Sequence, residues 1–270
     1  ATSSKIFNGV DAVEGEFPWR VYYEIPMKAA CGGTILNKNW VLTAAHCLDA
    51  IVKGREAEES IHIRAGSVSK WEGGQQIIVN GLAVTKHENF VNENGIAWND
   101  TALIKVPDPG FDFSNPNIKP VCLPYKFRGI GTIHKGLGIG AEQMCTTSPE
   151  RSVCEGDSGG SVDYKDDRGR YYAVGINSYM LNHCGAPQNV NVMAKVAMYL
   201  DWIEKNTGEK FCKKDFEHSK TSTNTGQIRS NTWIKPHTQG SSNTKQKIVL
   251  KKSLHIFTIF GDVITTLKIE

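Results

Sequence analysis

Three short segments of the sequence carry a histidine, an aspartate and a serine whose side chains could take part in one reaction. They are Thr43-Ala44-Ala45-His46-Cys47, Asn99-Asp100-Thr101-Ala102-Leu103-Ile104 and Cys154-Glu155-Gly156-Asp157-Ser158-Gly159-Gly160. A serine hydroxyl becomes an effective nucleophile only when a nearby base accepts its proton during the attack. Each segment alone has an ordinary interpretation, because Ser and Asp are common turn residues. If the fold brings the three side chains together, they are suited to nucleophilic catalysis.

Together and in this order, the three segments resemble the catalytic signatures of the chymotrypsin–trypsin family of serine proteases. The resemblance covers about residues 6–206. It implies that Ser158 is the nucleophile, that His46 is the general base and acid, and that Asp100 orients the imidazole. It also implies an oxyanion hole formed by the backbone N–H groups of Gly156 and Ser158. We therefore expect a serine endopeptidase that hydrolyses peptide bonds through an acyl-enzyme, with no metal ion or organic cofactor.

The N-terminal segment Lys5-Ile6-Phe7-Asn8-Gly9 is similar to the activation junction of the same family. Cleavage after Lys5 would free the amine of Ile6, which the resemblance pairs with Asp157. Residues 1–5 would then be the remnant of an activation peptide, and the uncleaved chain a zymogen. A buried ion pair formed on cleavage can act as a switch that orders nearby loops. The alternative is that residues 3–5 are simply a frayed terminus.

The resemblance also assigns residues to the pocket that selects the substrate. Ser152 stands at the floor of this pocket, and Ser178 and Met180 stand on its wall, with Asn191 opposite. A carboxylate at the floor would select Lys or Arg through a charge pair, which Ser152 cannot supply. The long thioether of Met180 should narrow the pocket. We therefore expect chymotrypsin-like or elastase-like cleavage and not trypsin-like cleavage.

Cysteines and overall charge indicate the compartment and the partners. The seven cysteines form no C-x-x-C pair, so zinc ribbons and thioredoxin-like sites have no support. Scattered cysteines fit disulfides and an oxidising compartment, and we expect a secreted, extracellular protein. With 31 basic and 28 acidic residues, the chain is too balanced to suggest a nucleic-acid partner. No apolar run is long enough to cross a membrane. The expected partners are protein or peptide substrates and protein inhibitors, and the expected state is a monomer.

The family resemblance pairs four of the cysteines. It implies the disulfides Cys31–Cys47, beside His46, and Cys154–Cys184, beside the nucleophile. Three cysteines are left over: Cys122, Cys145 and Cys212.

Short β-rich runs separated by Gly, Pro and Asn turns make up most of residues 6–206 and must position these side chains. Such runs predict an all-β fold, and the resemblance makes it two six-stranded antiparallel barrels with a C-terminal helix. Periodic apolar residues predict this helix over Met193–Asn206, ending near Gly208. The expected strands are Trp19–Ile25, Gly33–Leu36, Trp40–Thr43, Ile61–Ala65, Gln76–Val79 and Thr101–Val106.

Two parts of the chain depart from the family pattern. The stretch between Cys122 and Cys145 is too short to hold the strand pair that normally opens the second barrel, so this barrel should be truncated. After the protease domain, residues 6–208, the sequence continues as an extension over residues 209–270. Its polar composition predicts flexibility. Near its end, Ser253–Phe260 and Val263–Glu270 flank Gly261-Asp262 and read as a β-hairpin.

Several interpretations of these departures stay open. The final hairpin could be a poorly folded extension, the product of an altered transcript, or a replacement strand pair for the damaged barrel. For the function, the main alternative to an active peptidase is a catalytically inactive protease homologue that binds a partner or an inhibitor. A third alternative is a variant that does not fold productively.

Overall fold

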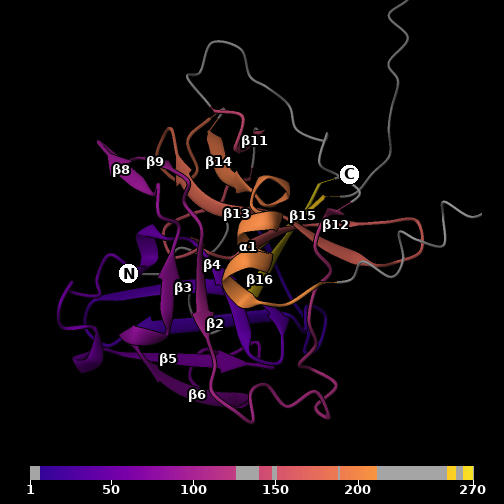
Figure 1. The fold of residues 1–270 in the computed structure, drawn as a ribbon. Helices are drawn as coiled ribbons and strands as arrows, with labels where there is room; N and C mark the ends of the chain where they lie inside the picture. The colour runs from indigo at the N-terminus through magenta and orange to yellow at the C-terminus, as the bar shows by residue number, and fades with distance from the viewer. Residues whose placement is uncertain are drawn as a thin grey trace, which may run out of the picture.

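The computed structural model describes residues 7–125, 140–147, 151–187 and 189–211, together with the backbone of residues 254–259 and 264–269 (Figure 1). The described elements are mostly strands, as the sequence predicted. Strands β2 to β7 and β10 form one sheet, whereas β1 and strands β11 to β16 form the other. The strands are β1 Val10–Asp11, β2 Arg20–Ile25, β3 Ala29–Asn37, β4 Trp40–Thr43, β5 Ser60–Ala65, β6 Gln75–Asn80, β7 Val84–Lys86, β8 Val91–Glu93, β9 Ile96–Trp98, β10 Ala102–Lys105, β11 Gln143–Thr147, β12 Ser161–Lys165, β13 Tyr171–Met180, β14 Val190–Lys195, β15 Leu254–Ile259 and β16 Ile264–Ile269.

The first sheet has seven antiparallel strands in the order β6-β5-β2-β3-β4-β10-β7. Its strands bury alternate residues where one face meets solvent, as in β5, and bury every residue at the centre, as in β4. These patterns are what half-buried and fully buried strands require. Two short strands, β8 and β9, form a separate two-stranded hairpin. In the sequence, this hairpin comes between β7 and β10 and ends just before Asp100.

The second sheet also has seven strands, in the order β1-β16-β15-β12-β13-β14-β11. Strands β15 and β16 come from the C-terminal extension, and they form the hairpin that the sequence predicted there. They lie between β12 and β1. The second sheet therefore gains two strands from the C-terminal extension, whereas the sequence indicated that the stretch between Cys122 and Cys145 is too short for the strand pair expected there. The rest of residues 212–270 lies outside the described part of the chain.

The one α-helix of the described residues is α1, Leu200–Thr207, and it begins later than the sequence predicted. Residues 193–195 belong instead to β14, which pairs with β11 on one side and β13 on the other. A 3₁₀ turn over Val196–Met198 then leads into the helix. Further 3₁₀ turns within the described residues include His46–Leu48, Glu56–Glu58 and Gly81–Ala83. The helix ends at Gly208, whose φ of 71° lies in the left-handed region that favours glycine. None of the described helices has the length and apolar character needed to cross a bilayer.

The two halves share a continuous hydrophobic core. One cluster of buried residues includes members of β2 to β5 and β10, and also Ile176 of β13 and Leu200 of α1. A buried ion pair joins the sheets as well: Arg20 Nη2 of β2 lies 3.0 Å from Asp163 Oδ2 of β12. Trp19 Nε1 donates to the same carboxylate at 2.7 Å. Buried polar contacts therefore link the two sheets, and one of the linked strands, β12, begins three residues after Ser158.

Candidate active site

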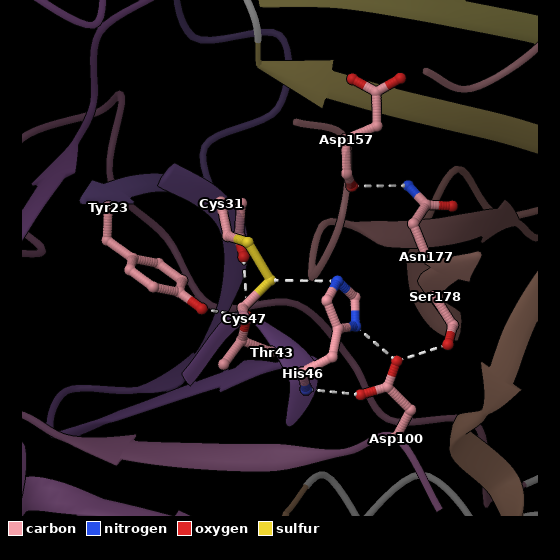
Figure 2. Close-up of a disulfide and its surroundings, with 10 residues drawn as sticks. Tyr23, Cys31, Thr43, His46, Cys47, Asp100, Asp157, Asn177 and Ser178 are labelled. Atoms are coloured by element: carbon pink, nitrogen blue, oxygen red, sulfur yellow. Dashed lines mark hydrogen bonds and ion pairs between the residues drawn. A yellow bond between two sulfur atoms is a disulfide. The ribbon is translucent and has the colours of Figure 1, made fainter. Parts of the chain in front are cut away.

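The pairing of β4 with β10 brings His46 next to Asp100. His46 opens the 3₁₀ turn that follows β4, Asp100 lies just before β10, and Ala102 is the register partner of Thr43. His46 Nδ1 lies 2.7 Å from Asp100 Oδ2 (Figure 2). The backbone N–H of His46 donates to Asp100 Oδ1 at 2.9 Å. Both oxygens of one carboxylate therefore fix the position of the imidazole.

Asp100 is buried, with 1% of its side chain exposed, and its neighbours determine its charge state. Burial alone would raise the pKa of the Asp100 carboxyl, but the hydrogen bond and charge of His46, together with the Ser178 hydroxyl, lower it below its usual value. Burial alone would lower the pKa of His46, but the hydrogen bond and charge of Asp100 raise it. The pair thus favours an ionised carboxylate beside an imidazole that readily holds a proton.

The segment that carries Ser158 is anchored to both sheets. The Ser158 carbonyl accepts a hydrogen bond of 2.8 Å from Gly32 N of β3, and Gly159 N donates to Asn177 O of β13 at 2.9 Å. Gly159 has φ of 77°, and a Cβ there would lie 2.3 Å from Thr43 Oγ1. Only glycine fits this conformation and this close approach. Ser158 is consequently held beside the strand that leads to His46.

No hydrogen bond joins His46 to the Ser158 hydroxyl within the described part of the chain. His46 Nε2, the ring nitrogen that faces away from Asp100, lies 3.7 Å from Cys47 Sγ. Hydrogen bonds between a catalytic base and its nucleophile are often long in free enzymes and tighten when substrate is bound. The structure therefore brings the three predicted residues into one region, but joins directly only His46 and Asp100.

The turn before Ser158 contains the two backbone N–H groups predicted for the oxyanion hole, those of Gly156 and Ser158. Gly156 has φ of 89°, and Asp157 N turns inward to donate to Cys154 O at 3.1 Å. Among the described residues, neither Gly156 N nor Ser158 N donates to a backbone carbonyl. The two N–H groups predicted for the oxyanion hole are therefore not used in these backbone hydrogen bonds.

The residues assigned to the specificity pocket have different surroundings. Ser152 is buried, and its hydroxyl accepts a hydrogen bond of 3.0 Å from Gly185 N. Met180 ends β13, and its sulfur accepts a hydrogen bond of 3.4 Å from Asn189 Nδ2. Asn191 is the register partner of Met180 and is buried, and its Oδ1 has no hydrogen-bond partner among the described residues.

Ser178, which the sequence placed on the pocket wall, points its hydroxyl at Asp100 Oδ2 and donates to it (Figure 2). This contact was missed from the sequence, because it depends on how β13 crosses the loop before β10. Gln143 of β11 was missed as well. Its Nε2 donates to Ala97 O at 2.8 Å and to Tyr179 Oη at 3.3 Å, and so links the β8–β9 hairpin to β13. No local pattern marks either residue.

The predicted activation residues are only partly within the described chain. Lys5 and Ile6 lie outside it, whereas Asp157 is buried and its Oδ2 accepts a hydrogen bond of 2.5 Å from Cys154 N. The next residue after Ile6 is docked: Phe7 N donates to Ser152 O at 3.0 Å. The chain therefore enters the described structure beside the turn that holds Asp157.

Both disulfides implied by the resemblance are present. Cys31 is bonded to Cys47, with a Cα–Cα distance of 6.2 Å, and Cys154 to Cys184, with a Cα–Cα distance of 5.0 Å. Within the described part of the chain, Cys122 and Cys145 form no disulfide, and Cys212 lies outside it. The sulfurs of Cys31 and Cys47 lie near His46, but a disulfide removes the thiolates that a metal would need.

Comparison with known proteins gives consistent matches. The sequence model of the trypsin family matches residues 6–143 and 130–203. A collagenase of Hypoderma lineatum is 28% identical over 246 residues, which is 76% of this chain and 88% of that protein. Transmembrane protease serine 9 of Rattus norvegicus is 28% identical over 75% of this chain, and Ovochymase-2 of Mus musculus is 27% identical over 71% of it. The chain spans only 22% and 37% of the length of the latter two.

A solved structure supports the same fold. The HL collagenase structure superposes with a TM-score of 0.60 and 25% sequence identity, and the match covers 76% of this chain and 100% of that one. Two sheets of antiparallel strands, a His–Asp pair at their junction and a family match over most of the chain agree with one another. The chain therefore belongs to the trypsin family of serine proteases.

Proposed function

We propose that the protein is an active serine endopeptidase in which Ser158 is the nucleophile, His46 the general base and acid, and Asp100 the orienting carboxylate. The observation that carries this proposal is the His46–Asp100 pair, with both carboxylate oxygens used on one histidine. Such a pair fixes the tautomer in which Nε2 can accept a proton. The anchoring of the Ser158 segment at Gly32 and Asn177 supports the role of Ser158.

In the proposed reaction, Ser158 Oγ attacks the carbonyl carbon of the scissile peptide as His46 Nε2 accepts the hydroxyl proton. The carbonyl oxygen becomes an oxyanion, to which Gly156 N and Ser158 N donate; losing one such donor typically costs about 2.7–4 kcal/mol in the barrier. The tetrahedral intermediate collapses, the C–N bond breaks, and His46 returns the proton to the leaving amine. Water then hydrolyses the acyl-enzyme by the same steps, and Ser158 is regenerated.

For specificity, we propose cleavage after apolar residues, in the manner of chymotrypsin or elastase. The support is the uncharged hydroxyl of Ser152, which is already used by Gly185 N, and the thioether of Met180 at the end of β13. A pocket without a carboxylate gives Lys and Arg no charge partner. Profiling with peptide libraries tests this, since a preference for basic residues would contradict it.

We also propose that the protein is secreted, acts as a monomer on protein substrates, and is activated by cleavage between Lys5 and Ile6. The support for activation is the docking of Phe7 on Ser152 and the burial of the Asp157 carboxylate close in sequence to Ser158. A new amine at Ile6 would then start one residue before a segment that is already docked. Replacing Lys5 with Gln should prevent tryptic activation without changing the fold.

Labelling with a fluorophosphonate after cleavage at Lys5-Ile6 tests the proposal, with Ser158→Ala as control. Stoichiometric labelling of the wild type alone is expected. The alternative function is a non-catalytic homologue that binds a partner or an inhibitor, and it is favoured by the missing hydrogen bond between His46 and Ser158 Oγ. A cleaved, folded protein that resists labelling would support that alternative.

A further inference from the structure

The strand that follows the nucleophile depends on a partner from the far end of the chain. β12 begins at Ser161, three residues after Ser158, and it pairs with β13 on one side and β15 on the other. The register partners across the β12–β15 boundary are Val162↔Ile256, Asp163↔His255 and Tyr164↔Leu254. The strand nearest to the nucleophile is thus internal in the sheet only because the C-terminal hairpin lies beside it.

The same hairpin also holds the beginning of the protease domain. β16 pairs with β15 along its whole length and with β1 on its other side, where Val10 lies opposite Thr266 and Asp11 opposite Thr265. Among the described residues, β1 has no other strand partner. Without the hairpin, β12 would have an open edge of backbone donors and acceptors, and β1 would leave the sheet.

The position of β12 is transmitted to the Ser158 segment through buried polar groups. Asp163 of β12 accepts hydrogen bonds from Trp19 Nε1 and from Ser161 Oγ, at 2.7 and 2.6 Å, besides its ion pair with Arg20. Arg20 also donates to the Ser161 carbonyl. A shift of β12 would therefore move the residues directly after Ser158, and a displacement of about 1 Å can reduce catalysis about 10²-fold.

We infer that β15 and β16 form a C-terminal hairpin that completes the second sheet of its own chain and positions the nucleophile segment. The hairpin replaces the strand pair for which the stretch between Cys122 and Cys145 has no room. It acts on catalysis through β12 and touches no reacting atom. Its catalytic consequence rests on the proposed function, whereas its structural consequence does not.

A chain that ends at residue 247 removes both strands and is the first test. A second variant, Ile256→Pro, keeps the full length. Residue 256 has a register partner on each side, Val162 in β12 and Leu267 in β16. Its backbone N–H therefore points at one of these two strands, and proline, which has no N–H, cannot donate to either. Gln239→Pro, which lies outside the two strands, is the matched control.

Two measurements separate the inference from the proposed function. Hydrogen exchange of the β12 amides should become at least about tenfold faster in the truncated chain and in Ile256→Pro, while the amides of β2 and β3 stay protected. Fluorophosphonate labelling should slow about 100-fold in both variants. A synthetic peptide of residues 248–270 should restore both properties to the truncated chain. Gln239→Pro should behave as wild type.

Each contrary outcome has a distinct meaning. Unchanged β12 exchange in the truncated chain would overturn the inference even if the wild type never reacts with fluorophosphonate. A wild type that does not label, with β12 exchange still dependent on the hairpin, would remove the proposed function and leave the structural inference standing. A full-length dimer that loses β12 protection on dilution would show that the hairpin comes from a second copy, and would overturn its assignment to the same chain.

Discussion

The buried ion pair between Arg20 and Asp163 gives the sharpest stability prediction. The Asp163 side chain is 0% exposed and the Arg20 side chain 2% exposed, so neither charge has water to replace a lost partner. Asp163→Leu removes the carboxylate that contacts the guanidinium and leaves it the Ser161 carbonyl, and breaking a buried pair in this way costs about 3–5 kcal/mol. Because typical domains are stable by about 5–15 kcal/mol, the variant would lose a large share of its stability.

The double variant Arg20→Met/Asp163→Leu should be less damaged than Asp163→Leu. It removes both charges, and the residual loss comes from donors left without an acceptor, chiefly Trp19 Nε1, at about 1–3 kcal/mol for such a group. Urea unfolding followed by fluorescence measures both variants, and an unchanged m-value shows that the same surface unfolds. If Asp163→Leu lowers the free energy of unfolding by less than about 1 kcal/mol, or the double variant is less stable than the single one, the ion pair does not hold the two sheets together.

Three further predictions concern the site itself. Asp100→Asn should lower the rate of fluorophosphonate labelling by about 10⁴, because the amide favours the wrong tautomer of His46. In the wild type, attack by Ser158 needs a neutral His46. Burial lowers the pKa of His46, but Asp100 raises it above the usual value. The labelling rate should therefore rise with pH and reach half its maximum above pH ~6.5. Half-maximal labelling at a lower pH would contradict the pairing of His46 with Asp100. Replacing both Cys31 and Cys47 with Ala should lower the free energy of unfolding, measured by thermal unfolding, by about 3 kcal/mol. The reason is that the disulfide closes a loop with a sequence separation of 16 residues.

The first sheet could be predicted closely from the sequence. The run Trp40–Thr43 has the observed bounds of β4, and Ile61–Ala65 differs from β5 by one residue. In both places the apolar pattern is local and turn residues mark the ends. The helix was predicted too early because Met193 to Val196 fits a helical period as well as a strand. Pairing with both β11 and β13 decided in favour of the strand.

The second sheet could be predicted only in part. The alternation of apolar and polar residues and the Gly261-Asp262 pair predicted a C-terminal hairpin. Its place between β12 and β1 depends on pairing between residues far apart in the sequence, such as Val162 and Ile256, which are more than 90 residues apart. No local pattern specifies such a pairing. The replacement of a missing strand pair was one of three open interpretations, and the described strands agree with it.

In the site, residue type and chain order were enough to single out His46, Asp100 and Ser158. The contact of Ser178 with Asp100 and the ion pair of Arg20 with Asp163 were not predictable, because the first joins β13 to the loop before β10 and the second joins strands of the two sheets. Such contacts depend on the packing angle between the sheets, which the sequence does not state.

Trapping the acyl-enzyme would test the central claim most directly. The cleaved protein is mixed with an activated ester of an apolar acyl-amino acid, quenched in acid, and measured by intact and peptide-level mass spectrometry. We predict one acyl group per chain, located on Ser158 and absent from Ser158→Ala. A folded, cleaved protein that carries no acyl group, or carries it on another residue, would contradict the assignment of Ser158 as the nucleophile.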